Sequence, residues 1–503
     1  MDHRIRWLGI FFIACFLLLF VQLNNWQVRQ GAALPGGTTT TTLPPNFWTA
    51  QRGFILTSDD QVMAMSVPAK GNQWQRKYPD GPLYEDVTGY FDPTAFASAY
   101  GLDISYNQYL EMHMSQVRTP SNLLTQHMET NDVVTTISSK LQQAAAAALA
   151  GQVGAVIALD PQTGAIYAMY ANPTYDPNKL STFNAASAAA YFKQLTTGTA
   201  ANNGVGPLNN GVTNVLNPPG STFKIVVSSA IYDHQPALAG KIWPGETGFV
   251  IPGTTTVFHN YASEYCPGGP GTLANVFAQS CDTAFARIAM ALGAEKMYEE
   301  AKSFGFGQSP PIDVPGANAS IFPAASQIAG NDAFEAYSAI GQLDDRATLL
   351  QMAEAAAAIA DNGTIMTPHV LNYVINQQGQ LVYRYQDHPW LQATTASTAG
   401  NVRQLMLGAT HLNIGTLYGT LSTFNFSNGL QVAGKTGTAQ VTNSLCGSDA
   451  WVTSFAPAGA GQTPDLVVAA EVGAQPGQCQ STGAGQAGPI VRAVYDSYYG
   501  IGP

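Results

Sequence analysis

One short stretch constrains the chain most: PPGSTFK at residues 218–224, which is followed by the apolar run IVVSSAI. Two prolines and a glycine terminate any helix or strand that comes before them, and an apolar run follows. The pattern therefore predicts a helix that begins at Ser221. Positions i and i+3 of a helix share a face, which should bring the Lys224 amine within hydrogen-bonding reach of the Ser221 hydroxyl. Serine is a weak nucleophile without an adjacent base, and burial lowers the pKa of a lysine toward that role. A capped helix with one exposed lysine is the alternative that this stretch alone leaves open.

The composition excludes several classes of function. The chain has 503 residues, enough for two or three domains, and a net charge of −11. No basic run is longer than two residues, so nucleic acid is not an expected partner. The eight histidines are scattered and no CxxC pair occurs, so we expect neither a metal site nor a cofactor.

The N-terminus is typical of a membrane anchor. Residues 7–23, WLGIFFIACFLLLFVQL, are nearly all apolar and follow Arg4 and Arg6. A cleaved signal peptide has a similar shape, but no small-x-small cleavage site follows closely. Because arginines stay inside, we expect a cytoplasmic tail at 1–6, a single span of the cytoplasmic membrane at 7–24, and all later residues outside. A linker rich in threonine, proline and glycine at 25–50 should join the span to the rest.

The five cysteines agree with this placement. Cys15 lies inside the predicted span, and the other four would lie outside the cell, where disulfides persist. Four cysteines allow three pairings, and we expect the two that are local in sequence, Cys266–Cys281 and Cys446–Cys479. Four free thiols in a reducing setting are the alternative.

Beyond residue 50 the chain divides into a small module and a large domain. Short apolar segments around a polar turn at 51–64 predict a β-hairpin, and residues 51–132 are expected to form a loop-rich, mostly β module. In the domain at 133–503, strands are expected near both ends and helices between them, which predicts an α+β fold. The expected helices of this domain are 137–150, 346–360, 401–411 and 489–498, and its expected strands are 154–160, 165–170, 430–441, 451–456 and 466–472.

Two more polar elements follow the Ser221 stretch. The helical pattern at 273–292 is interrupted by four poor helix formers, which predicts a loop that carries Ser280 and Asp282. The strand at 430–441 contains KTGT at residues 435–438, and glycine weakens a strand unless another backbone or a ligand approaches closely. Its lysine and threonines offer a cation and hydroxyls to a carboxylate ligand. A free N–H of this edge strand, with that of Ser221, could form an oxyanion hole.

Taken together, these elements resemble a class B penicillin-binding protein, a peptidoglycan D,D-transpeptidase. That family carries serine-x-x-lysine, serine-x-asparagine and lysine-threonine-glycine motifs in this order. The likeness covers residues 51–495 and includes segments at 52–53, 136–142, 158–164, 175–178, 339–342, 351–353 and 451–457. It implies an antiparallel sheet with helices on both faces and a helical subdomain, preceded by a small, mostly β pedestal of the dimerisation type.

The resemblance implies a role for each matching residue. Ser221 would attack the carbonyl between the two terminal D-alanines of a stem peptide, and Lys224 would accept its proton. β-Lactams would acylate Ser221 in place of the substrate, and a polytopic membrane glycan polymerase is the expected protein partner. The remaining roles are proton relay by Ser280 and substrate binding by Asp282, Lys435, Thr436, Gly437 and Thr438.

One position departs from the family pattern. The second motif usually ends in asparagine, and here it ends in Asp282. An ionised carboxylate only accepts hydrogen bonds, and beside Lys224 it would raise the pKa of the proposed base. A D,D-carboxypeptidase or β-lactamase, in which water replaces the acceptor amine, stays open as an alternative. A non-catalytic scaffold for the glycan polymerase stays open as a second one.

Overall fold

The computed structural model describes Trp7, Phe16 and residues 49–94, 98–114, 128–197, 206–422, 430–440, 447–474 and 482–501. The predicted tail lies outside these residues, as do nearly all of the predicted membrane span and linker. Cys15, Cys446 and Cys479 also lie outside them. Among the described residues, no helix has the length and apolar character that a bilayer crossing requires. Residues 49–503 form one compact unit.

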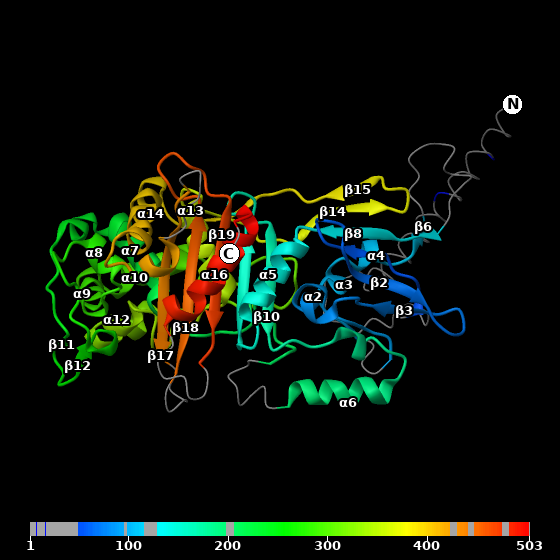
Figure 1. Cartoon of the computed structure of the whole chain (residues 1–503), viewed down its shortest axis with the longest axis horizontal. Coiled ribbons are helices and arrows are strands. Elements are labelled where there is room, and N and C mark those ends of the chain that lie inside the picture. Colours follow the sequence, from blue (N-terminus) through cyan, green and yellow to red (C-terminus); the bar gives the residue numbers. More distant parts are fainter. Residues whose placement is uncertain are drawn as a thin grey trace. The chain divides into compact units, whose positions relative to one another are not determined.

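A five-stranded antiparallel sheet forms the centre of the large domain (Figure 1). Its inner strands are buried on both faces, which explains why LVVAAEV at 466–472 is a continuous apolar run with one acid. Five of the strands expected from the sequence make this sheet, and β17 lies at its edge as predicted. In spatial order the strands are β10 (Ile166–Asn172), β9 (Gly154–Leu159), β19 (Leu466–Val472), β18 (Ser448–Ala456) and β17 (Ala433–Gln440).

Helices cover both faces of this sheet, as the fold class requires. α5 (Ser139–Leu149) and α16 (Gly488–Tyr499) share one apolar cluster with one face. α13 (Leu349–Ala360) packs on the other face and is buried along its whole length, in keeping with its alanine-rich sequence. The N-caps Ser138, Thr348 and Thr395 each accept a backbone N–H three residues on, which fixes the starts of α5, α13 and α14 (Ala396–His411).

A helical subdomain adjoins the β17 edge of the sheet (Figure 1). Its core is the large apolar cluster that includes Phe223, Phe277 and Phe285. Its helices include α7 (Lys224–His234), α8 (Leu273–Ala278), α9 (Asp282–Leu292), α10 (Ala294–Ser303), α11 (Ala325–Ile328) and α12 (Asp332–Ser338), and α14 packs on α7 and α8. α15 (Tyr418–Leu421) packs instead between α14 and α16. Two short antiparallel strand pairs lie in segments where we expected no strand: β11 (Gly248–Val250) with β12 (Val257–His259), and β13 (Thr364–Met366) with β16 (Pro389–Gln392).

The small module contains the predicted hairpin within a larger, mixed sheet. The order is β15 (Leu381–Arg384), β14 (Leu371–Asn376), β8 (Asn131–Thr135), β1 (Ile55–Leu56), β2 (Val62–Pro68) and β3 (Trp74–Lys77). The expected domain boundary at 132/133 falls inside β8, and β14 and β15 come from far along the chain. The module also holds α2 (Gly81–Thr88), α3 (Leu102–Ser105), α4 (Asn107–Leu110), β4 (Phe91–Asp92), β5 (Ser98–Ala99), β6 (His113–Met114) and β7 (Met128–Glu129), and α6 (Ala185–Thr196) follows the start of the large domain.

Arg52 and Gly53 hold the core of this module. The guanidinium groups of Arg52 and Arg76 pair with the buried Asp103, at 3.3 and 3.0 Å, and the Tyr78 hydroxyl donates to the same carboxylate at 2.7 Å. A Cβ at Gly53 would lie 1.8 Å from the Asn131 carbonyl oxygen, so only glycine fits where this backbone passes β8.

Candidate active site

Ser221 lies in a tight turn that leads into α7. We expected the helix to begin at Ser221, but residues Gly220–Phe223 form a 3₁₀ turn and the α-helix begins at Lys224. Gly220 has a φ of 55°, and its N–H donates to the Gly341 carbonyl at 3.0 Å. A Cβ at Gly220 would lie 3.2 Å from Thr438 C, so the turn packs directly against β17.

The predicted break in the second helical pattern is confirmed. α8 ends at Ala278, α9 begins at Asp282, and Ser280 between them has a left-handed φ of 61°. Asp282 belongs to the first turn of α9 rather than to the loop itself. The break turns both side chains toward the residue that begins α7.

Lys224 is fully buried and has three oxygen partners. Its Nζ lies 2.6 Å from Asp282 Oδ1, 2.7 Å from the Ser280 carbonyl oxygen and 3.2 Å from Ser280 Oγ. The Ser221 hydroxyl donates to the same Asp282 Oδ1 at 3.4 Å. Among the described residues, Lys224 and Ser221 are linked through Asp282 Oδ1, which accepts a hydrogen bond from each of them.

Burial and neighbouring charge act in opposite directions on Lys224. Burial lowers the pKa of its amine below the usual value, and the Asp282 carboxylate partly opposes that shift. The charge of Asp282 does raise the pKa of Lys224, as we expected from the sequence. Burial lowers this pKa by more, so the net shift is downward. The pKa of the fully buried Lys435 lies well below its usual value, first through burial and then through the charge of Lys224.

β17 brings the third polar element to the same place. Lys435 Nζ donates to Ser280 Oγ at 2.7 Å and to the Thr436 carbonyl at 3.0 Å. Thr436 Oγ1 contacts Thr416 Oγ1 at 2.9 Å, and the Gly483 N–H donates to Thr438 Oγ1 at 3.4 Å. Ser280 Oγ thus joins the two lysines in one hydrogen-bond network.

Gly437 confirms the expectation of a close approach. A Cβ at this position would lie 2.7 Å from the Pro219 carbonyl oxygen and 3.0 Å from Trp451 Cβ. The stretch GLQVAGKT at 429–436 also matches the GxxxxGK[ST] sequence pattern of a phosphate-binding loop. Lys435 and Thr436 lie within a strand, however, and such a loop would place them at the start of a helix.

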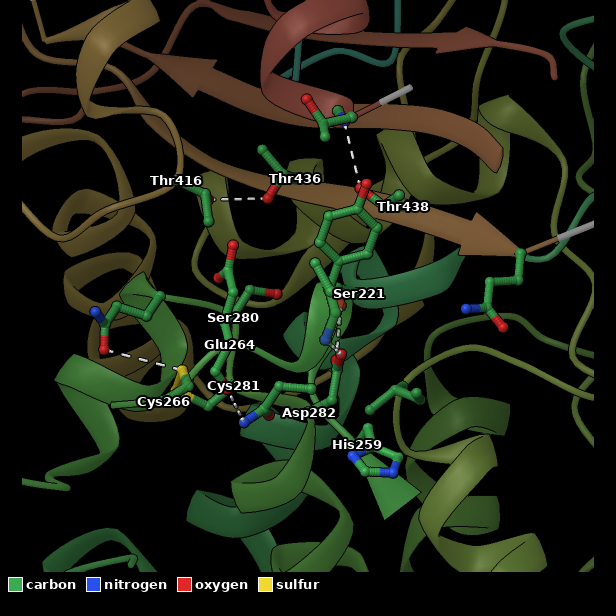
Figure 2. Close-up of a pocket in the computed structure, with 18 of the residues that line it drawn as sticks. Ser221, His259, Glu264, Cys266, Ser280, Cys281, Asp282, Thr416, Thr436 and Thr438 are labelled. Atoms are coloured by element: carbon green, nitrogen blue, oxygen red, sulfur yellow. Dashed lines mark hydrogen bonds between the residues drawn. A yellow bond between two sulfur atoms is a disulfide. The ribbon is translucent and has the colours of Figure 1, made fainter. Parts of the chain in front are cut away.

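These elements surround a pocket of about 460 Å³ (Figure 2). Ser221, Ser280 and Asp282 line it on one side, and Thr436, Thr438 and Thr416 on the other. Lys224 and Lys435 are fully buried behind these residues. No group of side chains able to hold a metal ion occurs among the described residues.

A disulfide joins the Ser280 loop to the segment before α8. Cys266 and Cys281 are bonded, with their Cα atoms 5.5 Å apart, as we expected from their sequence separation. The predicted Cys446–Cys479 bond falls outside the described residues.

The sequence analysis missed several residues of the pocket wall. Asn260, Tyr261 and Glu264 come from the segment after β12, and Thr416 comes from the segment before α15. The Tyr261 N–H donates to Asp282 Oδ2 at 3.2 Å. No recognisable motif marks these residues, and the only sequence signal is that the segment at 240–272 is rich in glycine and proline.

Comparison with known proteins finds matches along most of the chain. The penicillin binding protein transpeptidase domain matches residues 154–496, and the penicillin binding protein A dimerisation domain matches residues 52–133. Peptidoglycan D,D-transpeptidase PbpA of Mycobacterium tuberculosis is 28% identical over 515 aligned residues, with 99% of both chains covered.

Solved structures show the same likeness. The structure of penicillin-binding protein A from M. tuberculosis as a ceftriaxone acyl-enzyme complex has a TM-score of 0.78 at 28% identity, and the match covers 90% of this chain and 99% of that one. The D,D-transpeptidase domain of a peptidoglycan glycosyltransferase from Eggerthella lenta has a TM-score of 0.73 at 30% identity and covers 90% and 100% of the two chains.

Proposed function

Since the chain belongs to the penicillin-binding protein transpeptidase family, we propose that it cross-links peptidoglycan stem peptides through an acyl-enzyme on Ser221. One observation carries the assignment of the residues. Ser221, Lys224, Ser280 and Lys435 come from three separate elements and meet in one hydrogen-bond network at a pocket. A structural role alone would not require two buried lysines at one serine-lined site.

The acylation step follows from this network. Ser221 Oγ attacks the carbonyl carbon between the two terminal D-alanines, and its proton passes to the Lys224 amine, which burial favours in the neutral form. The Ser221 and Thr438 N–H groups stabilise the oxyanion, and the close packing of the Gly220 turn against Thr438 supports this role. The peptide C–N bond then breaks, and the leaving D-alanine amine receives a proton through Ser280, which bonds both lysines.

Substrate binding uses the β17 side of the pocket. Lys435, Thr436 and Thr438 offer one cation and two hydroxyls to the terminal carboxylate of the donor peptide. An incoming carboxylate would also favour the charged form of Lys435, whose pKa is low in the empty site. The neutral amine of a second stem peptide then attacks the acyl-enzyme carbonyl and forms the cross-link as the bond to Ser221 Oγ breaks. The proton that the amine loses passes through Lys224 to Ser221 Oγ, which regenerates the free serine.

The cellular setting is part of the proposal. The apolar segment at 7–23 supports a single-pass anchor with the catalytic domain outside the cytoplasmic membrane. Cys266–Cys281 agrees with an oxidising compartment. A polytopic glycan polymerase in the same membrane is the proposed partner.

Labelling with a fluorescent penicillin tests the proposal. Wild-type protein should form a covalent adduct that survives denaturation, and Ser221→Ala should abolish it. Ser228→Ala, which changes a buried serine seven residues further along the chain, within α7, is the matched control and should label normally. Absence of label on folded wild-type protein would favour the scaffold alternative, and rapid loss of the label would favour a β-lactamase.

A further inference from the structure

Glu264 lines the pocket and has no cationic partner. It follows the short turn Tyr261–Ser263, and its side chain extends into the pocket (Figure 2). Among the residues that the structure describes, its carboxylate has neither an ion pair nor a side-chain hydrogen bond. The residue is exposed, so its carboxylate is available to a ligand in the pocket.

The other charges of the pocket are already compensated. Asp282 pairs with Lys224 at 2.6 Å, and both lysines are buried behind the wall. Glu264 therefore contributes the one full charge among the described lining residues that no partner neutralises. A cleft lined by one sign of charge raises the local concentration of the opposite sign, so this side of the pocket favours a cation.

The backbone that carries Glu264 is strained and firmly held. Ala262 and Ser263 have left-handed φ values of 51° and 57°, which are uncommon for residues other than glycine and gather at functional sites. Asn260 Nδ2 donates to the Glu246 and Glu264 carbonyls at 2.7 and 3.0 Å, and its Oδ1 accepts the Thr283 N–H at 2.9 Å. The disulfide at Cys266 ties the end of the same segment to the Ser280 loop.

We propose that Glu264 forms an acceptor subsite, which binds the ammonium group of the second stem peptide until this group releases a proton to solvent and the neutral amine attacks the acyl-enzyme. The inference rests on the proposed transpeptidase function. The donor presents a carboxylate to Lys435, whereas the acceptor presents an amine that is mostly protonated at neutral pH. Lys435 on one side of the pocket attracts the carboxylate of the donor, and Glu264 on the other side attracts the ammonium group of the acceptor. Glu264 thereby raises the local concentration of the acceptor beside the acyl-enzyme.

The test separates acylation from transfer. The donor is an N-acyl-D-alanyl thioester, and the acceptors are a stem tripeptide containing L-lysine and hydroxylamine, which is uncharged at pH 7.5. The measured quantity is the ratio of aminolysis product to hydrolysis product at several acceptor concentrations. Penicillin acylation and the melting temperature are measured on the same samples.

Glu264→Gln should lower the aminolysis ratio for the tripeptide about two- to fivefold, the range for an exposed ion pair, and leave hydroxylamine transfer unchanged. Glu264→Asp should retain part of the preference, and added salt should weaken it in wild type but not in Glu264→Gln. Glu295→Gln removes an exposed carboxylate from α10, outside the pocket, and should have no effect.

Three results would overturn the subsite alone: an unchanged tripeptide ratio, an equal loss for both acceptors, or a change in penicillin acylation, which would place Glu264 on the donor side. A wild-type protein that penicillin does not acylate would overturn the proposed function, and the acceptor subsite with it.

Discussion

Asp282 partly opposes the effect of burial on the basicity of Lys224 and joins this lysine to Ser221. Its Oδ1 accepts hydrogen bonds from the Ser221 hydroxyl and from Lys224 Nζ, and its Oδ2 accepts from the Tyr261 N–H. The carboxylate thereby positions the nucleophile and the base around one oxygen. It also stabilises the ammonium form of Lys224, which cannot accept a proton from Ser221.

We therefore predict that Asp282→Asn accelerates acylation at neutral pH. The amide keeps an oxygen for Ser221 and Lys224 but removes the negative charge, so the already lowered pKa of Lys224 should fall further. In the pH profile of the acylation rate, the midpoint of the decline at low pH should shift to a lower pH by about one to three units. This is the usual effect of removing a close opposite charge. Each unit raises the neutral fraction of the amine about tenfold where the ammonium form dominates.

The measurement is the second-order rate of penicillin acylation between pH 5 and 10, with the melting temperature as a check on folding. An equal or slower rate for Asp282→Asn at pH 7 would show that the carboxylate assists the reaction and would contradict the prediction.

At the scale of elements, the sequence predicted what depends on local rules. Four poor helix formers predicted the break that exposes Ser280, and a glycine beside Lys435 predicted a close backbone approach. The α-helix begins later than expected because Gly220 adopts a left-handed φ and bonds Gly341, a contact made across 121 residues. Tyr261 and Thr416 reach the pocket through tertiary packing, which leaves no periodic signal in the chain.

Gly437 is where β17 and the nucleophile turn approach most closely. We predict that Gly437→Ala lowers penicillin acylation by at least about tenfold, because its Cβ would push against the Pro219 carbonyl and shift the turn that carries Ser221. Gly400→Ala is the matched control, since a Cβ there has open space within α14 and alanine favours a helix. The acylation rates and melting temperatures of both variants check this, and equal rates would mean that the strand and the turn adjust freely.

The disulfide links the pocket wall to the Ser280 loop. Removing it through Cys266→Ala with Cys281→Ala should lower the free energy of unfolding by ~3 kcal/mol, as expected for a closed loop of 15 residues. Acylation should also slow, because the segment at 260–266 holds Asp282 through the Tyr261 N–H.

Urea unfolding and penicillin acylation measure these two effects. Dithiothreitol should reproduce both in wild type and change neither in the double variant. Unchanged acylation after complete reduction would show that the other contacts of the loop suffice to hold it.

At the scale of the molecule, the two family domains share one sheet. β8 spans the boundary that we expected at 132/133 and pairs in parallel with β1 on one side and antiparallel with β14 on the other. Local patterns could not predict this, because β14 and β15 lie more than 230 residues after β8 in the chain. The module at 51–132 is therefore a structural partner of the catalytic domain.

We predict that a chain of residues 136–503 fails to fold as the chain of residues 49–503 does. Without β8, strand β14 loses its partner on one edge, and the buried side chains of Leu371 and Val374 lose the cover of Val133. An unpaired apolar edge promotes aggregation. The shorter chain should be poorly soluble or should melt well below the longer one, and its soluble fraction should bind less fluorescent penicillin.

A truncation removes the whole module, so a single substitution in the longer chain tests the contribution of β8 alone. Val133 is fully buried in β8, so Val133→Asp should lower the melting temperature by placing a charge in the shared core. Asp132→Asn, at the neighbouring half-buried position, is the milder control. If residues 136–503 melted and labelled like residues 49–503, β14 would be stable without its sheet, and the two domains would be independent folding units after all.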